Sequence, residues 1–127
     1  NPLNCLLKDL TSQGAGLDCA SRTEIKQAMD LGLTPKDIVY SNPVKDENDL
    51  EWAADNQIGI TTADTIDELE KIKQIAPRMK ILWRIAIKEE SADKLSTPFS
   101  GKFGDDIDSE LKIRSRMREI KEMGVKL

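Results

Sequence analysis

Short apolar runs recur along the 127-residue chain at intervals of roughly twenty residues, and each is followed by apolar positions at helical spacing. The runs cover residues 16–20, 38–42, 59–62 and 81–85. Such an interval leaves room for one strand, one helix and two tight loops, which together form the repeating unit of a parallel sheet. The pattern therefore predicts four successive βα units.

Residues typical of helix ends lie where this pattern needs them. Two S/T-x-x-E capping boxes directly follow expected strands, and they are Ser21 with Glu24 and Thr65 with Glu68. Glycine readily takes the left-handed conformation that ends a helix, and one follows three of the helical stretches. These glycines are Gly14, Gly32 and Gly124. Residues 87–104 show no clear period, and we expect a long loop there.

Four βα units without a break in composition indicate either a doubly wound sheet or a (β/α)8 barrel. No G-x-G-x-x-G or G-x-x-x-x-G-K-[ST] string is present, so dinucleotide or P-loop binding by a doubly wound sheet has no support. A barrel needs about 250 residues. We therefore expect a contiguous segment of a parallel (β/α)8 TIM-type barrel, cut or processed because Asn1 is not preceded by a Met. Alone, half a barrel should be inactive and poorly folded, since its sheet edges and inner apolar face stay open.

The composition excludes several classes of function. The chain has 19 basic and 23 acidic residues, which are interspersed, so the basic surface of a nucleic-acid binder is missing. It has no His, which excludes His-based triads and His metal sites within these residues. Two Cys make neither a disulfide framework nor a metal site, and they favour a reducing, cytoplasmic location. No apolar run is long enough to span a membrane, and no signal peptide is visible.

Candidate chemistry lies at the carboxyl ends of the expected strands, which form the working face of a βα barrel. The polar residues placed there are Asp18, Asn42, Thr62, Asp64 and Arg84. Arg84 lies within an apolar run, where a charge rarely occurs without a partner. It suits an anionic group or a phenolate oxygen of a ligand, or else a structural ion pair with Asp18 or another carboxylate. Asp18 in turn could orient a cationic amine, or serve a helix start or a salt bridge.

Three further features have a structural and a functional interpretation. Glu24 is explained as the third residue of its capping box, and a functional role for it stays open. Cys19 follows Asp18 and should point to the opposite face of the strand, where it belongs to the core rather than acting as a nucleophile. Nine acids without Lys or Arg lie between Asp46 and Glu70, which is typical of a solvated helix face. Any partner of that face should be basic or neutral.

Several of these strings resemble one protein family. Residues 16–25, G-L-D-C-A-S-R-T-E-I, resemble the G-F-D-C-A-S-x-x-E-I stretch of eukaryotic-type ornithine decarboxylases, pyridoxal-phosphate enzymes with an alanine-racemase-like barrel. In the same order, residues 40–43 resemble the family's Y-A-N-P, residues 83–85 its L-R-I and residues 102–104 its K-F-G. Residues 1–2 resemble the end of its A-V-K-x-N motif, whose lysine carries the cofactor. The similarity covers essentially the whole chain.

The resemblance implies roles for four residues and a cofactor, pyridoxal 5'-phosphate. Arg84 matches an arginine near the pyridoxal ring oxygen, and Asp18 matches an aspartate beside the Schiff-base lysine. Glu24 matches a glutamate that supports the same pocket. Lys102 matches a lysine at the interface of a homodimer whose active sites are completed by the neighbouring subunit. The sequence departs from the family near this interface, because the loop from 87 to 102 is longer and Phe99 stands where the family usually has an aliphatic residue.

The resemblance also implies what these residues lack. The Schiff-base lysine would precede Asn1, and the family's stacking His, phosphate loop and remaining catalytic groups would follow Leu127. No catalytic residue is therefore expected within residues 1–127, which would form part of the pyridoxal-phosphate-binding barrel domain without the family's C-terminal β-domain.

The implied activity of the full-length protein is decarboxylation of ornithine to putrescine, the first step of polyamine biosynthesis. Three alternatives stay open. The substrate could be lysine, arginine or diaminopimelate, or the protein could be a catalytically inactive homologue that acts by binding, like antizyme inhibitors. The third alternative is an unrelated βα domain that matches by chance. The acid-rich run argues against antizyme as a partner, because antizyme is itself acidic.

Overall fold

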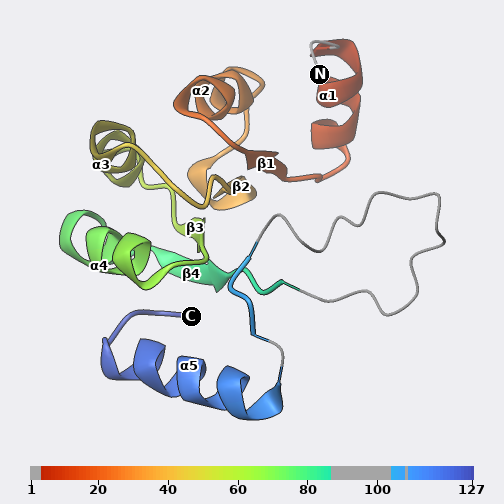
Figure 1. The fold of residues 1–127 in the computed structure, drawn as a ribbon. Helices are drawn as coiled ribbons and strands as arrows, with labels where there is room; N and C mark the ends of the chain where they lie inside the picture. The colour runs from red at the N-terminus through yellow and green to blue at the C-terminus, as the bar shows by residue number, and fades with distance from the viewer. Residues whose placement is uncertain (1–3, 87–103, 108) are drawn as a thin grey trace, which may run out of the picture.

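The computed structural model describes residues 4–86, 104–107 and 109–127. Its four strands form one parallel sheet in the order β1-β2-β3-β4 (Figure 1). The strands are β1 (Leu17–Cys19), β2 (Ile38–Tyr40), β3 (Ile60–Ala63) and β4 (Lys80–Trp83). All four predicted strands are confirmed, and each observed strand overlaps its predicted run.

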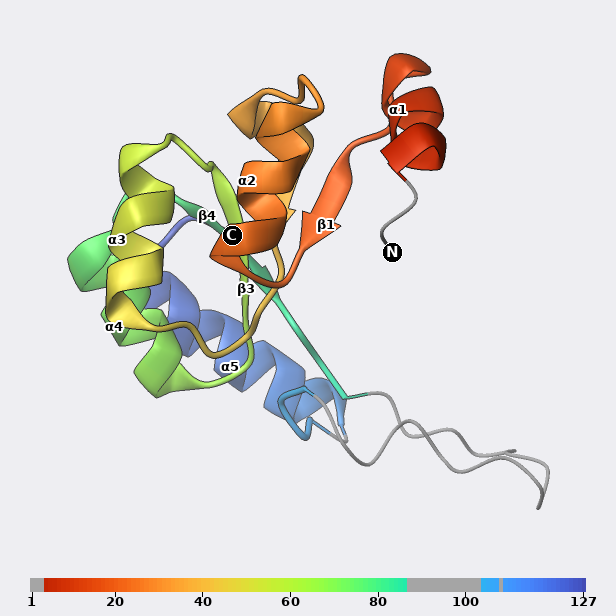
Figure 2. The same ribbon diagram turned by 90° about the horizontal axis from the view of Figure 1, so that it is seen from above.

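One helix precedes β1, and a helix follows each of the four strands in chain order. They are α1 (Asn4–Ser12), α2 (Arg22–Asp30), α3 (Glu47–Asp55), α4 (Ile66–Ile75) and α5 (Glu110–Glu122), and a short 3-10 turn, η1 (Pro35–Asp37), precedes β2. Figures 1 and 2 show α1 to α5 arranged as an arc around the outside of the strands. Among the described residues, no helix has the length and apolar character needed to cross a bilayer.

The sheet continues beyond β4 in the same direction. Lys126 forms a parallel bridge with Lys80, and the backbone N–H of Ile81 donates to the carbonyl of Lys126 at 2.7 Å. A doubly wound sheet reverses its strand order at a switch point, whereas a barrel adds each strand beside the last. The strand order is therefore that of a barrel segment.

Each strand has one face buried by the helices and one face turned away from them. Tyr40, Thr61 and Ile81 are at most 2% exposed, whereas Leu82, the neighbour of Ile81, is 49% exposed. The helices cover the buried face with their own apolar stripes, which include Ile25, Ala28, Leu50, Ala53, Leu69 and Ile72. This alternation defines an outer, helix-covered face and an inner face, as in a barrel wall.

The segment after residue 103 returns to the end of β4 through a close backbone contact at Gly104. Gly104 has φ +103°, and a Cβ there would lie 2.5 Å from the backbone nitrogen of Ala86. This approach allows Asp105 to bond with the backbone on both sides: its N–H donates to the carbonyl of Arg84 at 2.9 Å, and its carbonyl accepts from Ala86 at 3.0 Å. Gly104 thus fixes where the chain enters α5.

The Asp105 side chain joins β4 to α5. Its Oδ2 accepts from the indole N–H of Trp83 at 3.1 Å and from Nε of Arg116 at 2.7 Å. Trp83 stands where the resembling motif has Leu, and its indole N–H is thereby satisfied at a half-buried position.

We expect Gly104→Ala to lower the melting temperature more than Gly32→Ala. Gly32 also has a positive φ, +96°, but a Cβ there meets nothing within 4 Å. The control variant should therefore cost only the conformational strain of about 1–2 kcal/mol, and Gly104→Ala should cost about 1–3 kcal/mol more from overlap with the backbone. Thermal unfolding of the full-length protein measures the difference. Equal losses in the two variants would contradict the close approach.

Cys19 belongs to the core, as its position next to Asp18 predicted. It is 2% exposed, whereas Asp18 is exposed on the opposite face. Burial raises the pKa of the Cys19 thiol to about 11, and the charges of Glu24 and Asp18 act in the same direction. At neutral pH the thiol is therefore protonated and unsuited to act as a nucleophile.

Alkylation by iodoacetamide at pH 8 should modify Cys19 at least about tenfold more slowly than Cys5, which is exposed in α1. Peptide mass spectrometry of the native protein resolves the two sites. Because the pKa of Cys19 is raised, its rate should still increase above pH 9, where an ordinary thiol approaches its maximum. Equal rates for the two cysteines at pH 8 would show that the burial is wrong.

Candidate functional site

The predicted site residues lie at or near the carboxyl edge of the sheet. Asp18 is the central residue of β1, and Asp64 and Arg84 directly follow β3 and β4. Because the strands are parallel, their carboxyl ends meet at the same edge, which is the working end of a βα barrel. The structure therefore brings strand-borne carboxylates and a guanidinium to one side of the fold.

Arg84 is held by Asp64. Its Nε donates to Asp64 Oδ2 at 3.1 Å, its Nη2 lies 2.5 Å from the same oxygen, and its backbone N–H donates to the carbonyl of Ala63 at 2.8 Å. The carboxylate side chain is 12% exposed and the guanidinium side chain 32% exposed. The expected ion pair thus exists, with Asp64 rather than Asp18, and part of the guanidinium still faces outward from the protein.

Asp18 lies on the inner face of β1, opposite Cys19. Among the described residues, its carboxylate forms neither a hydrogen bond nor an ion pair. An exposed carboxylate on the inner wall can stabilise a cationic group of a ligand. The structure therefore leaves the predicted role of Asp18 chemically open, since no salt bridge occupies it.

Half of the capping box predicted at Ser21 and Glu24 is formed, because the Glu24 carboxylate binds the residue before the N-cap instead of Ser21. The Ser21 hydroxyl accepts from the backbone N–H of Glu24 at 3.2 Å, and the Glu24 carboxylate accepts from the backbone N–H of Ala20 at 2.6 Å. The bond to Ala20 ties the start of α2 to the turn after β1. Glu24 therefore fixes the backbone that follows Asp18, and its direct role in a ligand pocket stays a prediction.

The second predicted capping box is only half formed, because Glu68 has other partners. Thr65 Oγ accepts from the Glu68 N–H at 3.3 Å, but the Glu68 carboxylate lies 2.9 Å from Lys45 Nζ and 2.6 Å from Lys71 Nζ. The side chains of Lys45 and Glu68 are 0% and 3% exposed. The acid-rich run was expected to be a solvated face, so burial of Glu68 corrects that expectation at one residue.

Lys45 is the functional candidate that sequence reasoning missed. Its ammonium donates to the carbonyl of Asn42 at 2.9 Å and to that of Thr62 at 2.8 Å, besides its ion pair with Glu68. Burial lowers its pKa from the ordinary value, while the hydrogen bond and charge of Glu68 oppose that change. The available signal was the position of Lys45 and Lys71, which bound the run of acids on either side.

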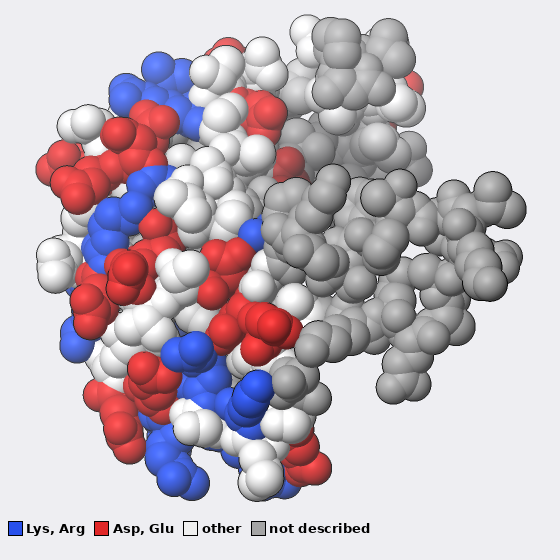
Figure 3. Space-filling view, viewed as in Figure 1, with Lys and Arg blue, Asp and Glu red and all other residues white. Residues whose placement is uncertain are grey.

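The remaining predictions concern the dimer-interface residues, a metal site and the surface charge. Lys102, expected at a dimer interface, lies outside the described residues, as does Phe99. Within the described part of the chain, no group of three or more His, Cys, Asp or Glu side chains could hold a metal ion. The face seen in Figure 3 carries interleaved acidic and basic side chains without an extended basic area.

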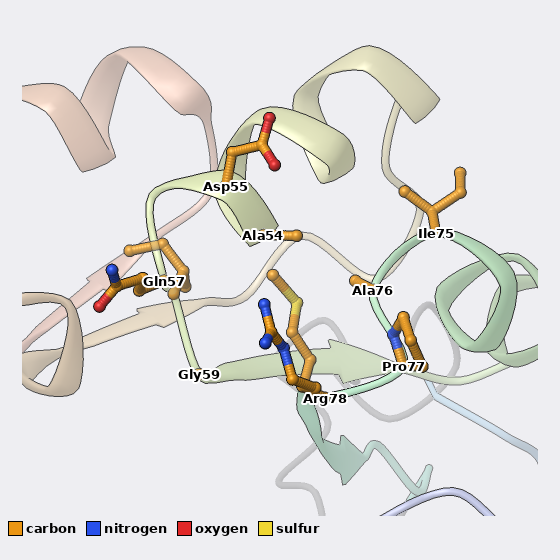
Figure 4. A pocket seen from close by; sticks show the side chains of 10 residues that line it. Ala54, Asp55, Gln57, Gly59, Ile75, Ala76, Pro77 and Arg78 are labelled. Atoms are coloured by element: carbon orange, nitrogen blue, oxygen red, sulfur yellow. The ribbon is translucent and has the colours of Figure 1, made fainter.

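A hollow lined by described residues lies at the other end of the sheet. A groove of about 560 Å³ is lined by residues 54–55, 57–59 and 75–79, where α3 and α4 end and lead into β3 and β4 (Figure 4). Asp55 and Arg78 lie on its rim. Because this groove is at the amino ends of the strands, it is separate from the carboxyl edge that carries Arg84.

Comparison with known proteins places the chain in a family. The family described as "Pyridoxal-dependent decarboxylase, pyridoxal binding domain" matches residues 1–127. A probable ornithine decarboxylase of Dictyostelium discoideum is 35% identical over 127 residues, which are all of this chain and 26% of that protein. Antizyme inhibitor 2 of Xenopus laevis is 38% identical over 99 residues, 78% of this chain and 21% of that protein.

A solved structure agrees with this placement. The arginine decarboxylase of Paramecium bursaria Chlorella virus superposes on the whole chain with a TM-score of 0.84 and 30% identity, and the chain covers 32% of it. The expected barrel segment is thereby confirmed, and the chain spans about a fifth to a third of the length of these relatives. The cofactor of the family is pyridoxal phosphate. The chain therefore belongs to the pyridoxal-binding domain of the pyridoxal-dependent decarboxylases.

Proposed function

We propose that the full-length protein is a pyridoxal-phosphate-dependent decarboxylase that converts ornithine to putrescine and carbon dioxide, the first step of polyamine biosynthesis. The observation that carries this proposal is the position of Arg84, which Asp64 holds at the carboxyl edge, together with the inward-facing Asp18. Matches to ornithine decarboxylases over the full chain support it. Residues 1–127 then form part of the barrel domain, and the family's C-terminal β-domain lies elsewhere in the protein.

The residues present fit the cofactor. A guanidinium that stays partly exposed can donate to the anionic ring oxygen, and an unpaired inner-face carboxylate can hold an amine as a cation. When bound, the cofactor supplies the electron sink for loss of the carboxylate. The described residues act by binding and orientation: Arg84 favours the charged ring oxygen, Asp18 retains a proton on the amine, and Glu24 fixes the turn after β1.

We further propose that the protein works as a homodimer with Lys102 at the interface. This rests on the K-F-G string alone, since Lys102 lies outside the described residues. The two free cysteines fit a reducing compartment, and we propose the cytoplasm.

A binding protein without catalysis is the second candidate, favoured by the match to antizyme inhibitor 2. The lysine that carries the cofactor decides between the two functions, and it would precede Asn1. The acid-rich surface between Asp46 and Glu70 argues against antizyme as the partner, because both would carry negative charge.

Arg84→Ala and Asp18→Ala should each weaken pyridoxal-phosphate binding or turnover of the full-length enzyme by about tenfold, equivalent to ~1.4 kcal/mol. Titration of the cofactor by visible absorbance and steady-state kinetics measure the two effects. Arg78→Ala and Asp55→Ala remove the same charges at the opposite end of the sheet and should leave both quantities unchanged. Wild-type affinity and turnover in both site variants would exclude the assigned roles.

Release of carbon dioxide from ornithine, lysine, arginine and diaminopimelate tests the substrate. We expect the highest kcat/KM with ornithine, because the D-C-A-S string matches the ornithine branch. A tenfold preference for another of these amino acids would keep the decarboxylase and change its substrate. No turnover of any of them, together with capture of antizyme by the purified protein, would replace the proposal with the binding function.

A further inference from the structure

The Lys45 ammonium lies where two strand ends need support. β2 ends at Tyr40, whose partner is Thr61, so β3 continues past the last paired residue of β2. The carbonyl of Thr62, one residue further, accepts from Lys45 Nζ at 2.8 Å. The Lys45 side chain is fully buried. Its ammonium also donates to the carbonyl of Asn42, which follows β2. One side chain thus joins the carboxyl ends of two neighbouring strands.

The arrangement uses the full donor capacity of the ammonium. Its three N–H groups face three acceptors within 2.9 Å, namely the two carbonyls and Glu68 Oε1. Glu68 Oε2 in turn pairs with Lys71 Nζ, and the Lys71 ammonium also bonds to the carbonyl of Lys45. A buried ion pair is costly to desolvate and is weak evidence for added stability. The bonds of the Lys45 ammonium to two backbone carbonyls therefore indicate that it positions the backbone at these strand ends.

Thr62 connects this cluster to the candidate site. Asp64 lies two residues after Thr62, and its carboxylate holds the guanidinium of Arg84. Ala63, between them, accepts the backbone N–H of Arg84. A displacement of the Thr62 carbonyl would therefore move both the side-chain and the backbone partners of Arg84.

We propose that Lys45, anchored by Glu68, is a positioning residue that fixes the end of β3 and thereby orients the Asp64–Arg84 pair toward the cofactor. Only the orientation of the pair toward the cofactor rests on the proposed function. Lys45 cannot contact a ligand itself, because its side chain is fully buried and its donors are occupied. It acts through Asp64.

Lys45→Met tests the proposal in the full-length protein, since Met preserves the length of the side chain and Glu68 keeps Lys71 as a partner. In the cofactor-free protein, hydrogen exchange of peptides that cover residues 60–66 and 83–86 should become faster. Pyridoxal-phosphate affinity should fall by about fivefold or more, with the KM for substrate changed by less than about twofold. Asp64→Asn should have the same effect, and the double variant should be no worse than either single one, because both act through Arg84.

Lys71→Met is the matched control. It removes the other cation of Glu68 but no bond to a strand end, so it should leave exchange at 83–86 and cofactor affinity as in the wild type. If Lys45→Met folds poorly, Lys45→Met with Glu68→Gln removes both buried charges and should still show fast exchange. Wild-type exchange and affinity in the Lys45 variants, or equal damage by Lys71→Met, would overturn the proposal. A wild-type protein that does not bind pyridoxal phosphate would reject the proposed function, while the exchange comparison would still decide the role of Lys45.

Discussion

Burial of one face of the parallel sheet under its helices is the constraint on which the other features depend. Side chains alternate along each strand, so when Cys19, Tyr40 and Ile81 enter the helix-covered core, their neighbours must face inward. Asp18 and Leu82 lie on that inner face for this reason alone. The same alternation places Arg84, two residues after Leu82, on the inner side of the carboxyl edge. Packing of the outer layer therefore decides which polar groups can meet a ligand.

The charged groups at the carboxyl edge form a series in which burial decreases toward the site. Lys45 and Glu68 are almost fully buried, Asp64 is mostly buried and the guanidinium of Arg84 is about one third exposed. Buried charges need partners, and those partners restrict the backbone to one arrangement. An exposed guanidinium without such support would lose more conformational entropy when it binds a ligand. The series thus connects the buried core to the partly exposed guanidinium of Arg84.

A different device fixes the other side of β4. Gly104 permits an approach to Ala86 that no Cβ allows, and Asp105 then bonds both the backbone beside Arg84 and the side chains of Trp83 and Arg116. Arg84 is therefore bounded on one side by Ala63 and Asp64 and on the other by Asp105. Ala63 and Asp105 hold the backbone of Arg84, and Asp64 holds its guanidinium. The position of Arg84 is therefore set by contacts within these four βα units.

The periods of two and 3.6 residues determined the four strands and the helices between them, because these patterns arise from local backbone geometry and the need to bury one face. They also located Asp64 and Arg84 at strand ends and placed Cys19 in the core, whereas Asp18, expected at a strand end, is the central residue of β1. The pairing of Arg84 with Asp64 instead of Asp18 was decided only in three dimensions, since several carboxylates were available at the same edge. Glu68 likewise satisfied a local capping motif in the sequence, but its carboxylate turned to Lys45. A buried ammonium requires a buried counter-charge, and only the tertiary structure brings those two residues, 23 positions apart, together.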